Sequence, residues 1–215
     1  AYEIYQCDWS SDVCSSDLID VKKMRSSDTQ TVDNAKIYLD LNREGMVDQL
    51  ELDAVAGKGA VYMRLKPDEL RGITNFRLEA DDAGAALRAF DVYRNVIGGK
   101  LALQGASQPG KSRYFIYGKV QMTNFNVVNA PALAVLVSAI SPVGLPMLLS
   151  NDGLFFSRLD SKFKWQMRRP GDLYEISDGR SSGSSLGLTF EGKVDKDRKS
   201  TRLNSSHTDI SRMPS

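Results

Sequence analysis

The residues of this chain best suited to metal binding or covalent catalysis are its two cysteines and its single histidine. Cys7, Cys14 and His207 occur with aspartates nearby, and residues of these types form disulfides or Cys/His zinc sites. All three lie close to the ends of the chain. Their chemistry therefore depends on whether those ends belong to the folded protein.

Both ends read as translated sequencing adapter. Asp8–Leu18 back-translates into one strand of a common short-read library adapter, and Asp197–His207 back-translates into its reverse complement. The flanking residues also permit one index barcode and its complement. We expect residues 1–18 and 197–215 to be adapter-derived artefacts and exclude them from the search for a site. Because adapter flanks it on both sides, we expect the stretch 19–196 to be a fragment of a longer protein.

Residues 19–196 contain no cysteine and no histidine. A thiol nucleophile, an imidazole base, a Cys/His zinc site and a disulfide are thereby excluded from that stretch. The paired carboxylates Asp81 and Asp82 precede a helical pattern and are expected to cap its N-terminus rather than to perform acid–base or metal chemistry. The serine-rich stretch Ser177–Ser185 has hydroxyls without a nearby base and is expected to form a loop. The sequence therefore predicts no enzyme, no metal and no cofactor.

The charge balance argues against a nucleic-acid partner. The chain carries 28 Lys or Arg and 27 Asp or Glu, a net charge of +1, and removing the two ends takes away four basic and six acidic residues. The net charge of the remaining stretch is therefore +3. That charge is too mild to imply nucleic acid, which usually needs a clustered basic face.

Alternation of apolar and polar residues with period two dominates residues 19–196 and predicts strands with one apolar face. Short links containing Gly or Pro join the runs, which is typical of an antiparallel meander. The expected strands cover 37–41, 50–54, 61–65, 74–80, 113–128, 155–167, 173–176 and 186–194. In the clearest strand, one face carries Phe155, Leu159, Phe163, Trp165 and Met167, and the final strand adds Leu186, Leu188 and Phe190.

Few helices are available to cover such a sheet. One is expected at Ala83–Tyr93, followed by a positive-φ turn at Gly98–Gly99. The most apolar stretch, Ala130–Leu149, is about as long as a membrane span, but internal prolines interrupt it. We expect it to form helices at 132–140 and 145–149. These would pack on the sheet or contact lipid or another apolar ligand, and a membrane span is the least favoured alternative.

Several phrases of the sequence occur in an order that resembles one known family. They are FRLEADDAGAALRAFDVYRNVIGGKLALQG (Phe76–Gly105), GKVQMTNFNVVNAPALAVLVSAIS (Gly118–Ser141), NDGLFFSRLDSKFKW (Asn151–Trp165) and YEISDGRSSGSSLGLTFEGKVD (Tyr174–Asp195). Together they resemble the C-terminal region of the AsmA-like proteins of Gram-negative bacteria, the AsmA/YhdP/TamB type. The resemblance extends over Phe76–Asp195 and is loose before that. Its phrases consist of turn glycines, strand faces and a helix cap, and they carry no catalytic residue.

The resemblance implies a long, twisted antiparallel sheet that forms an open groove, with short helices near its C-terminal end. It also implies a protein anchored in the inner membrane, through a part absent from this chain, that extends through the periplasm. Such proteins are implicated in outer-membrane lipid homeostasis by conducting phospholipids along the groove. Phospholipid acyl chains are then the expected ligand, and inner- and outer-membrane proteins are the expected protein partners.

Two functions remain open on the sequence. In the first, a lipid conduit, the candidate groove residues are Phe155, Leu159, Phe163, Trp165, Met167, Leu186, Leu188 and Phe190. Each of these side chains can equally be part of a closed core. In the second, the domain is a structural or assembly module for outer-membrane biogenesis whose exposed strand edges pair with another protein. Both functions use apolar faces and open edges, so the sequence does not separate them.

Overall fold

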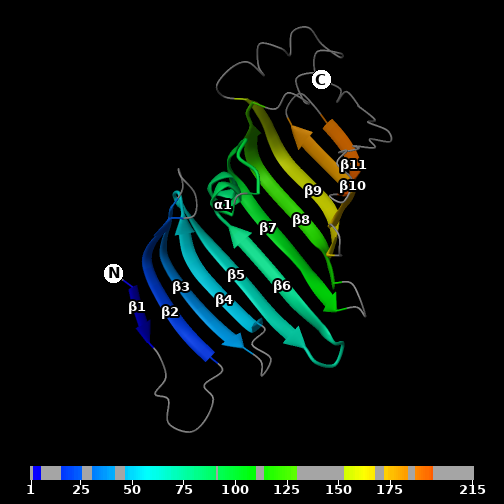
Figure 1. Cartoon of the computed structure of the whole chain (residues 1–215). Helices are drawn as coiled ribbons and strands as arrows, with labels where there is room; N and C mark the ends of the chain where they lie inside the picture. Colours follow the sequence, from blue (N-terminus) through cyan, green and yellow to red (C-terminus); the bar gives the residue numbers. More distant parts are fainter. Residues whose placement is uncertain are drawn as a thin grey trace.

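The computed structural model describes residues 2–5, 16–25, 31–41, 47–90, 92–109, 114–129, 153–167, 172–183 and 187–195. Within them, eleven strands form one antiparallel sheet, in the order β1 to β11. Figure 1 shows the strands side by side in chain order, in a twisted single layer. The sheet is open, since β1 and β11 lie at its two edges. The predicted mainly β fold with a long, open antiparallel sheet is thereby confirmed.

The strands are β1 (Tyr2–Tyr5), β2 (Ser16–Arg25), β3 (Thr31–Leu41), β4 (Val47–Ala56), β5 (Gly59–Asp68), β6 (Ile73–Ala80), β7 (Val96–Pro109), β8 (Tyr114–Val127), β9 (Leu154–Met167), β10 (Leu173–Gly183) and β11 (Gly187–Asp195). The strands β7, β8 and β9 have 14 residues each. At about 3.3 Å per residue each spans roughly 46 Å, well beyond an average strand. β1 and the first residues of β2 belong to the N-terminal stretch that reads as adapter.

Short links between successive strands produce the meander. Gly57 and Lys58 form the two-residue turn between β4 and β5, and Gly57 has a φ of +63°. Such turns need positive φ, which glycine adopts without steric cost. The turn between β5 and β6 is closed by the N–H of Arg71, which donates to the carbonyl oxygen of Asp68 over 3.1 Å.

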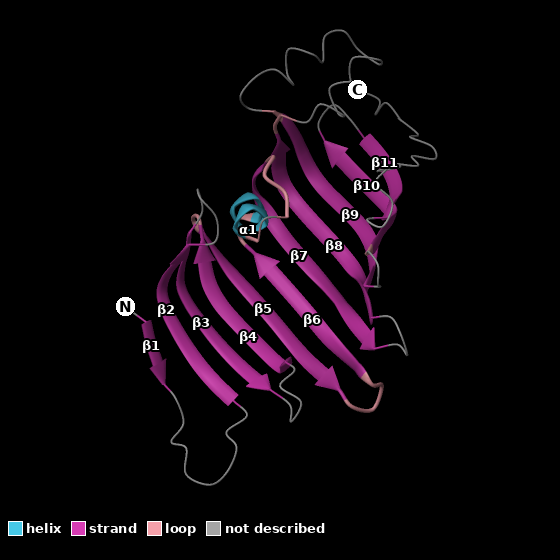
Figure 2. Cartoon of the chain, viewed as in Figure 1, coloured by secondary structure: helices cyan, strands magenta, loops and turns pink. Residues whose placement is uncertain are grey.

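The helix α1 (Ala83–Ala89) connects β6 to β7. Figure 2 shows it at one end of the strands, against the single layer of the sheet. A side-chain oxygen of Asp82 accepts a hydrogen bond of 2.9 Å from the N–H of Ala85, which confirms the predicted cap. The helix ends at Ala89, four residues before the predicted Tyr93. Valine and tyrosine near that predicted end are poorer helix formers than alanine, and the chain must turn back there to begin β7.

α1 is the one helix among the described residues, and it lies in the middle of the chain. The helices predicted at 132–140 and 145–149 fall outside the described residues. β11 confirms the final predicted strand, except that Leu186 also falls outside the described residues.

β10 is longer than the sequence predicted. The loop predicted at Ser177–Ser185 is wrong for residues 177–183, which continue the strand. Asp178 has a φ of 52°, and the pairing register shifts beside it against both neighbouring strands, which defines a bulge. Beyond the bulge, the buried Ser181 donates from Oγ to the carbonyl oxygen of Arg158 over 3.2 Å. Pairing on both sides of β10 outweighs the low strand propensity of serine and glycine.

Gly98 and Gly99 lie inside β7 and not in a turn between two units, which corrects the predicted turn. Their φ angles are +64° and +82°, and Asn124 on the neighbouring strand β8 has a φ of +54°. The pairing of β7 with β8 keeps one register through this point. Both strands therefore depart from regular strand conformation at the same row.

The alternation of buried and exposed positions shifts by one residue at that row. On β7 the buried residue before the glycine pair is Val96 and the one after it is Leu101, five positions apart. On β8, Met122 and Phe125 are both buried and three positions apart. Regular alternation puts residues an odd number of positions apart on opposite faces, so the positive-φ residues restore one common buried face.

Glycine-to-alanine substitutions at this row should separate the cost of a positive φ from the cost of steric overlap, through their effects on the free energy of unfolding. In Gly99→Ala, the new Cβ would lie 2.7 Å from the Cβ of Phe125 at a positive φ, so the free energy of unfolding should fall by about 2 kcal/mol or more. In Gly98→Ala the φ is also positive but no atom lies within 4 Å, so the loss should be about 1 kcal/mol.

Urea unfolding of the whole chain measures these losses, with Gly192→Ala as the matched control. Gly192 has no atom within 4 Å of the added Cβ and no positive φ, so its change should stay within about 0.5 kcal/mol. Equal losses at Gly98 and Gly99 would contradict the close approach of Phe125.

Candidate functional site

One face of the sheet carries an unbroken row of apolar side chains that crosses the strands. Each strand from β2 to β8 contributes one apolar residue, and each of these residues is paired with the one on the next strand. These residues are Ile19, Ile37, Leu52, Met63, Leu78, Leu103 and Val120. All of them are half-buried. We call the face that bears this row the acyl face.

A second row runs beside the first on the same face. It aligns Leu50, Leu65, Phe76, Gly105, Gly118 and Phe163 across β4 to β9. The rings of Phe76 and Phe163 lie 6.2 Å apart, although two strands separate their own strands. The space above the two glycines accommodates them, since a Cβ on Gly105 would lie 2.8 Å from the Phe76 ring.

The buried core consists mainly of alanines and valines, with a few larger residues such as Phe125 and Phe156, and lies at one end of the acyl face. Ala83, Ala85, Ala86 and Ala89 of α1 are all buried there. The helix sits directly on β7, since a Cβ on Gly84 would lie 2.5 Å from the carbonyl oxygen of Val96. Among the described residues, no large side chain is less than 2 % exposed. The larger apolar side chains therefore remain half-open along the rest of the face.

Six of the eight predicted site residues lie on this face. In the register, Leu188 pairs with Ser181, Ser181 with Leu159 and Leu159 with Met122, so these positions form a further row on the same face from β8 to β11. The ring of Phe190 packs against Gly179. The six residues are Leu159, Phe163, Trp165, Met167, Leu188 and Phe190. Leu186 lies outside the described residues.

Phe155 lies on the opposite face, which corrects the predicted grouping. Phe155 is 46 % exposed, whereas Phe156 is 2 % exposed and stacks on Phe125 at 5.5 Å. The reason is a bulge at Ser157, where the pairing of β9 with β10 skips one residue. The bulge reverses the alternation that the sequence pattern assumed.

Sequence reasoning did not nominate the apolar residues of β4 to β8 as site residues, although they form most of the acyl face. Each strand showed the right alternation, with Leu52, Met63 and Leu78 among the apolar positions. The signal that was missing is register. A row across the sheet exists only when neighbouring hairpins align these positions, and short turns such as Gly57–Lys58 impose that alignment.

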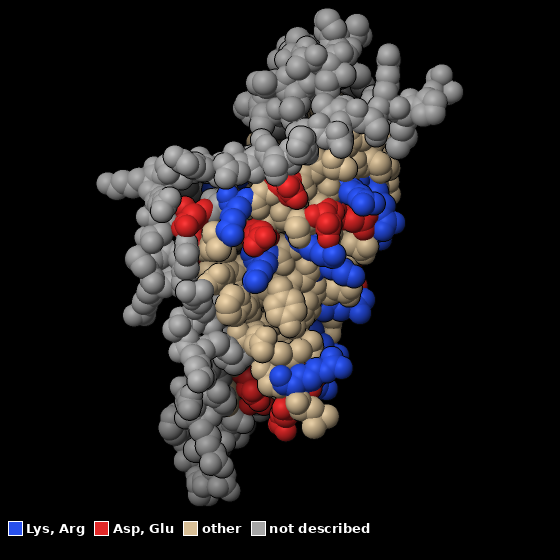
Figure 3. Space-filling view, turned by 90° about the vertical axis from the view of Figure 1, so that its right-hand side faces the viewer, with Lys and Arg blue, Asp and Glu red and all other residues tan. Residues whose placement is uncertain are grey.

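The opposite face is polar and carries charges of both signs. One row on it aligns Glu51, Arg64, Arg77, Gln104, Lys119 and Lys162 across β4 to β9. Arg64 Nε donates to Glu51 over 2.8 Å, and Lys162 forms an ion pair with Asp178 at 2.6 Å. Figure 3 shows basic and acidic side chains interspersed on one side of the molecule. This face therefore interacts with water and does not form a single-sign patch.

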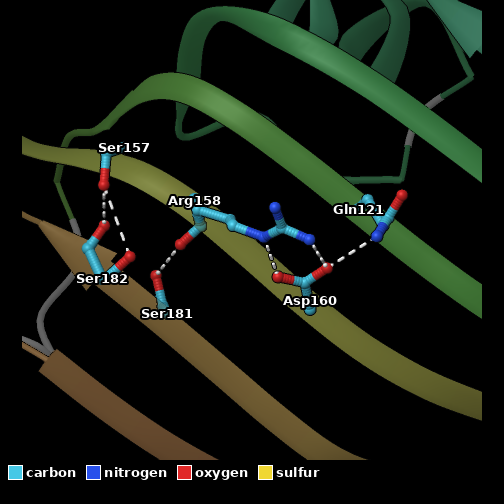
Figure 4. Close-up of polar contacts among 6 residues, drawn as sticks. All are labelled: Gln121, Ser157, Arg158, Asp160, Ser181 and Ser182. Carbon is cyan, nitrogen blue, oxygen red and sulfur yellow. Dashed lines mark hydrogen bonds and ion pairs between the residues drawn. The ribbon is translucent and has the colours of Figure 1, made fainter.

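A polar network lies beside the bulge of β9 on this face (Figure 4). Arg158 pairs with Asp160 through Nε and through Nη2, the latter over 2.8 Å, and the amide of Gln121 donates to Asp160 over 2.7 Å. The hydrogen bonds from Arg158 lower the pKa of the Asp160 carboxyl below its ordinary value, and burial opposes them. Ser157 Oγ donates to the carbonyl oxygen of Ser182 over 2.9 Å, which satisfies the backbone at the bulge.

The described residues contain no cluster of three or more His, Cys, Asp or Glu side chains that could hold a metal ion. No described helix combines the length and the apolar character that a membrane span requires. The arrangement that distinguishes this part of the chain is a sheet with one apolar and one charged face, where a single short helix covers one end.

No family model matches the chain, and neither the curated proteins nor the solved structures give a match.

Removing the guanidinium of Arg158 tests the network beside the bulge. In Arg158→Ala, the pKa of Asp160 should rise toward the ordinary value of aspartate, because the carboxylate loses its main hydrogen-bond donor. A pH titration of the Asp160 carboxyl carbon by NMR measures this. Gln121→Ala should give a smaller rise in the same direction.

Because the pKa of Asp160 is lowered in the folded chain, the free energy of unfolding depends on pH. The ionised Asp160 stabilises the folded chain above the pKa of an ordinary aspartate, and this contribution is lost as the pH falls through the lower folded pKa. Arg158→Ala should therefore flatten the loss of stability in acid, and an unchanged pKa of Asp160 in that variant would contradict the assignment.

Proposed function

We propose that the acyl face binds the hydrocarbon chains of phospholipids and that this chain is a segment of a lipid conduit. The observation that carries the proposal is the aligned row of half-buried apolar side chains from Ile19 to Val120. A protein in water rarely leaves so continuous an apolar surface half-open unless a ligand or partner covers it. Among the described residues, α1 covers one end of it.

The dimensions of the row suit an acyl chain. Adjacent strands lie about 4.8 Å apart, so the row across β2 to β8 runs for roughly 29 Å. The chains of one leaflet span about 15 Å, half of a bilayer's hydrocarbon core. A row longer than one chain provides continuous apolar contact along which a chain can move from strand to strand. Each methylene group that leaves water there contributes about 0.8 kcal/mol.

The charged face opposite supports the same function. Glu51, Arg64 and Lys162 keep that side of the sheet in water, so along these charged rows the sheet presents hydrocarbon contact on the acyl face. A phospholipid has the same division between acyl chains and a polar headgroup. A one-sided sheet therefore shields the chains while the headgroup stays at the wet margin.

The resemblance of Phe76–Asp195 to the C-terminal region of AsmA-like proteins supplies the proposed cellular setting. In that setting, the parent protein is anchored in the inner membrane, extends through the periplasm and contributes to phospholipid transport to the outer membrane. The strand order and the open sheet are compatible with this setting.

Extraction of bound lipid tests the proposal. The whole chain is purified from bacterial cells, extracted with organic solvent and analysed by mass spectrometry, and phospholipid is expected in reproducible molar proportion. In Leu103→Asp the lipid should fall at least about tenfold, because a charged carboxylate on the acyl face must be desolvated by the acyl chain.

The matched control is Gln104→Asp, the next residue on β7, which is exposed on the charged face and should leave the lipid unchanged. Circular dichroism checks that both variants keep the strand content of the parent chain, and Leu103→Ser provides a milder polar change if the aspartate variant unfolds. A folded, lipid-free parent chain would contradict the conduit and favour an assembly module that acts by protein contacts.

A further inference from the structure

The end of the sheet next to α1 exposes apolar side chains on the face that is charged elsewhere. Ile97 is 47 % exposed and Phe155 is 46 % exposed. The register places Ile97 beside Asn126, and Asn126 beside Phe155, so the two side chains belong to one row across β7, β8 and β9. The shift of alternation at Gly98–Gly99, Asn124 and Ser157 places them on this face.

The connection from α1 to β7 adds three more exposed apolar residues at the same end. They are Phe90, Val92 and Tyr93, of which Val92 is 68 % exposed. The connection is fixed to the end of β8. The N–H of Val128 donates to the carbonyl oxygen of Asn95 over 2.9 Å, and Asn95 Nδ2 donates to the carbonyl oxygen of Asn129 over 2.9 Å.

We call these five residues, Phe90, Val92, Tyr93, Ile97 and Phe155, the apolar tip. Ile97 and Phe155 are on the face opposite α1, while the other three belong to the connection that leaves α1. A flat protein partner contacts one face, whereas a fluid apolar layer surrounds both.

The sequence that enters and leaves this end argues for lipid as the occupant. Val127 pairs with Leu154, so the chain departs from and returns to the tip between these residues. From Ala130 to Asn151 the sequence carries no charged side chain. Exposed aliphatic, phenylalanine and tyrosine side chains are the kinds that partition into the interfacial layer of a membrane.

We propose that the apolar tip inserts into the surface of a lipid bilayer. Insertion buries Ile97, Phe155 and Val92 in the outer hydrocarbon and places Tyr93 at the headgroup level. The charged rows farther along the strands remain in water. The strand ends then meet the bilayer, and the acyl face lies beside the lipid surface. The proposal stands on the exposure of the tip and does not require the acyl face to bind lipid.

Flotation with vesicles tests the proposal. The whole chain is mixed with vesicles of phosphatidylethanolamine and phosphatidylglycerol, and in parallel with vesicles of phosphatidylcholine. It should float with both, because insertion is apolar. The Ile97→Ser/Phe155→Ser variant should bind both kinds of vesicle at least about tenfold more weakly, since it loses the two side chains that face outward from the tip.

The matched control is Leu70→Ser/Tyr117→Ser, which also removes one aliphatic and one aromatic exposed side chain. Leu70 is 100 % exposed in the turn between β5 and β6, at the opposite end from α1, and Tyr117 is exposed on the charged face. This control should bind vesicles as the parent chain does. Near-native circular dichroism of both double variants excludes unfolding as the cause.

Three results would overturn insertion of the tip. The first is equal flotation of the parent and tip variants, and the second is an absence of flotation by the parent chain. The third is binding that requires phosphatidylglycerol and disappears in about 0.5 M salt, where charge interactions are screened. A parent dimer in sedimentation that the tip variant abolishes, without vesicle binding, would assign the tip to a second copy.

The lipid-extraction experiment and the flotation experiment test the acyl face and the apolar tip separately. Leu103→Asp removes lipid from the acyl face and leaves the tip intact, so that variant should lose extracted lipid and still float. The tip variant should keep extracted lipid and lose flotation. If Leu103→Asp loses both, one apolar surface serves both roles and the separate tip is contradicted.

Discussion

Pairing of neighbouring strands within one layer is the interaction on which the rest of this structure depends. A sheet usually buries its apolar face against a second layer, but among the described residues α1 is the one element outside the sheet. The fully buried core is therefore confined to alanines, valines and a few larger residues near that helix. Elsewhere the strands are held by their backbone ladders and by side-chain rows that are only half-buried. The open acyl face is a direct consequence of this single-layer construction.

The row of positive-φ residues is the second determinant of the architecture. Gly98, Gly99 and Asn124, with the bulge at Ser157, shift the alternation of three neighbouring strands by one residue at the same level, so that the strands bury the same face on both sides of it. On one side of this row, the buried residues Val96 and Phe156 pack toward α1. On the other face, the same change exposes apolar residues at the strand ends. The same backbone irregularities thus produce both the core under the helix and the exposed apolar tip.

The two faces of the sheet have different energetic roles. The ion pairs of the charged face, such as Lys162 with Asp178, are exposed to solvent, so each contributes little to stability. Their effect is to keep that face hydrated and to disfavour stacking with another sheet. The acyl face carries the apolar surface that a ligand would remove from water. The same half-buried rows therefore contribute to stability and to the proposed lipid binding. For a variant such as Leu103→Asp, the strand content must be measured together with the amount of bound lipid.

The sequence by itself determined eight of the eleven strands, all except β1, β2 and β7, together with the alternating polarity of their residues. Alternation at Leu52, Met63 and Leu78 is a local property with period two, and Asp82 ahead of an alanine-rich stretch is a local cap signal, so both were predictable. The helix end after Ala89 and the continuation of β10 through Ser177 were not, because pairing with neighbouring strands outweighs local propensity there. Only the tertiary structure decided which residues share a face across strands. A single bulge at Ser157 reverses every side chain beyond it, and one positive-φ glycine pair does the same on β7. Such irregularities depend on how segments far apart in the sequence pair with one another. The alternation within a single strand carries no information about that pairing.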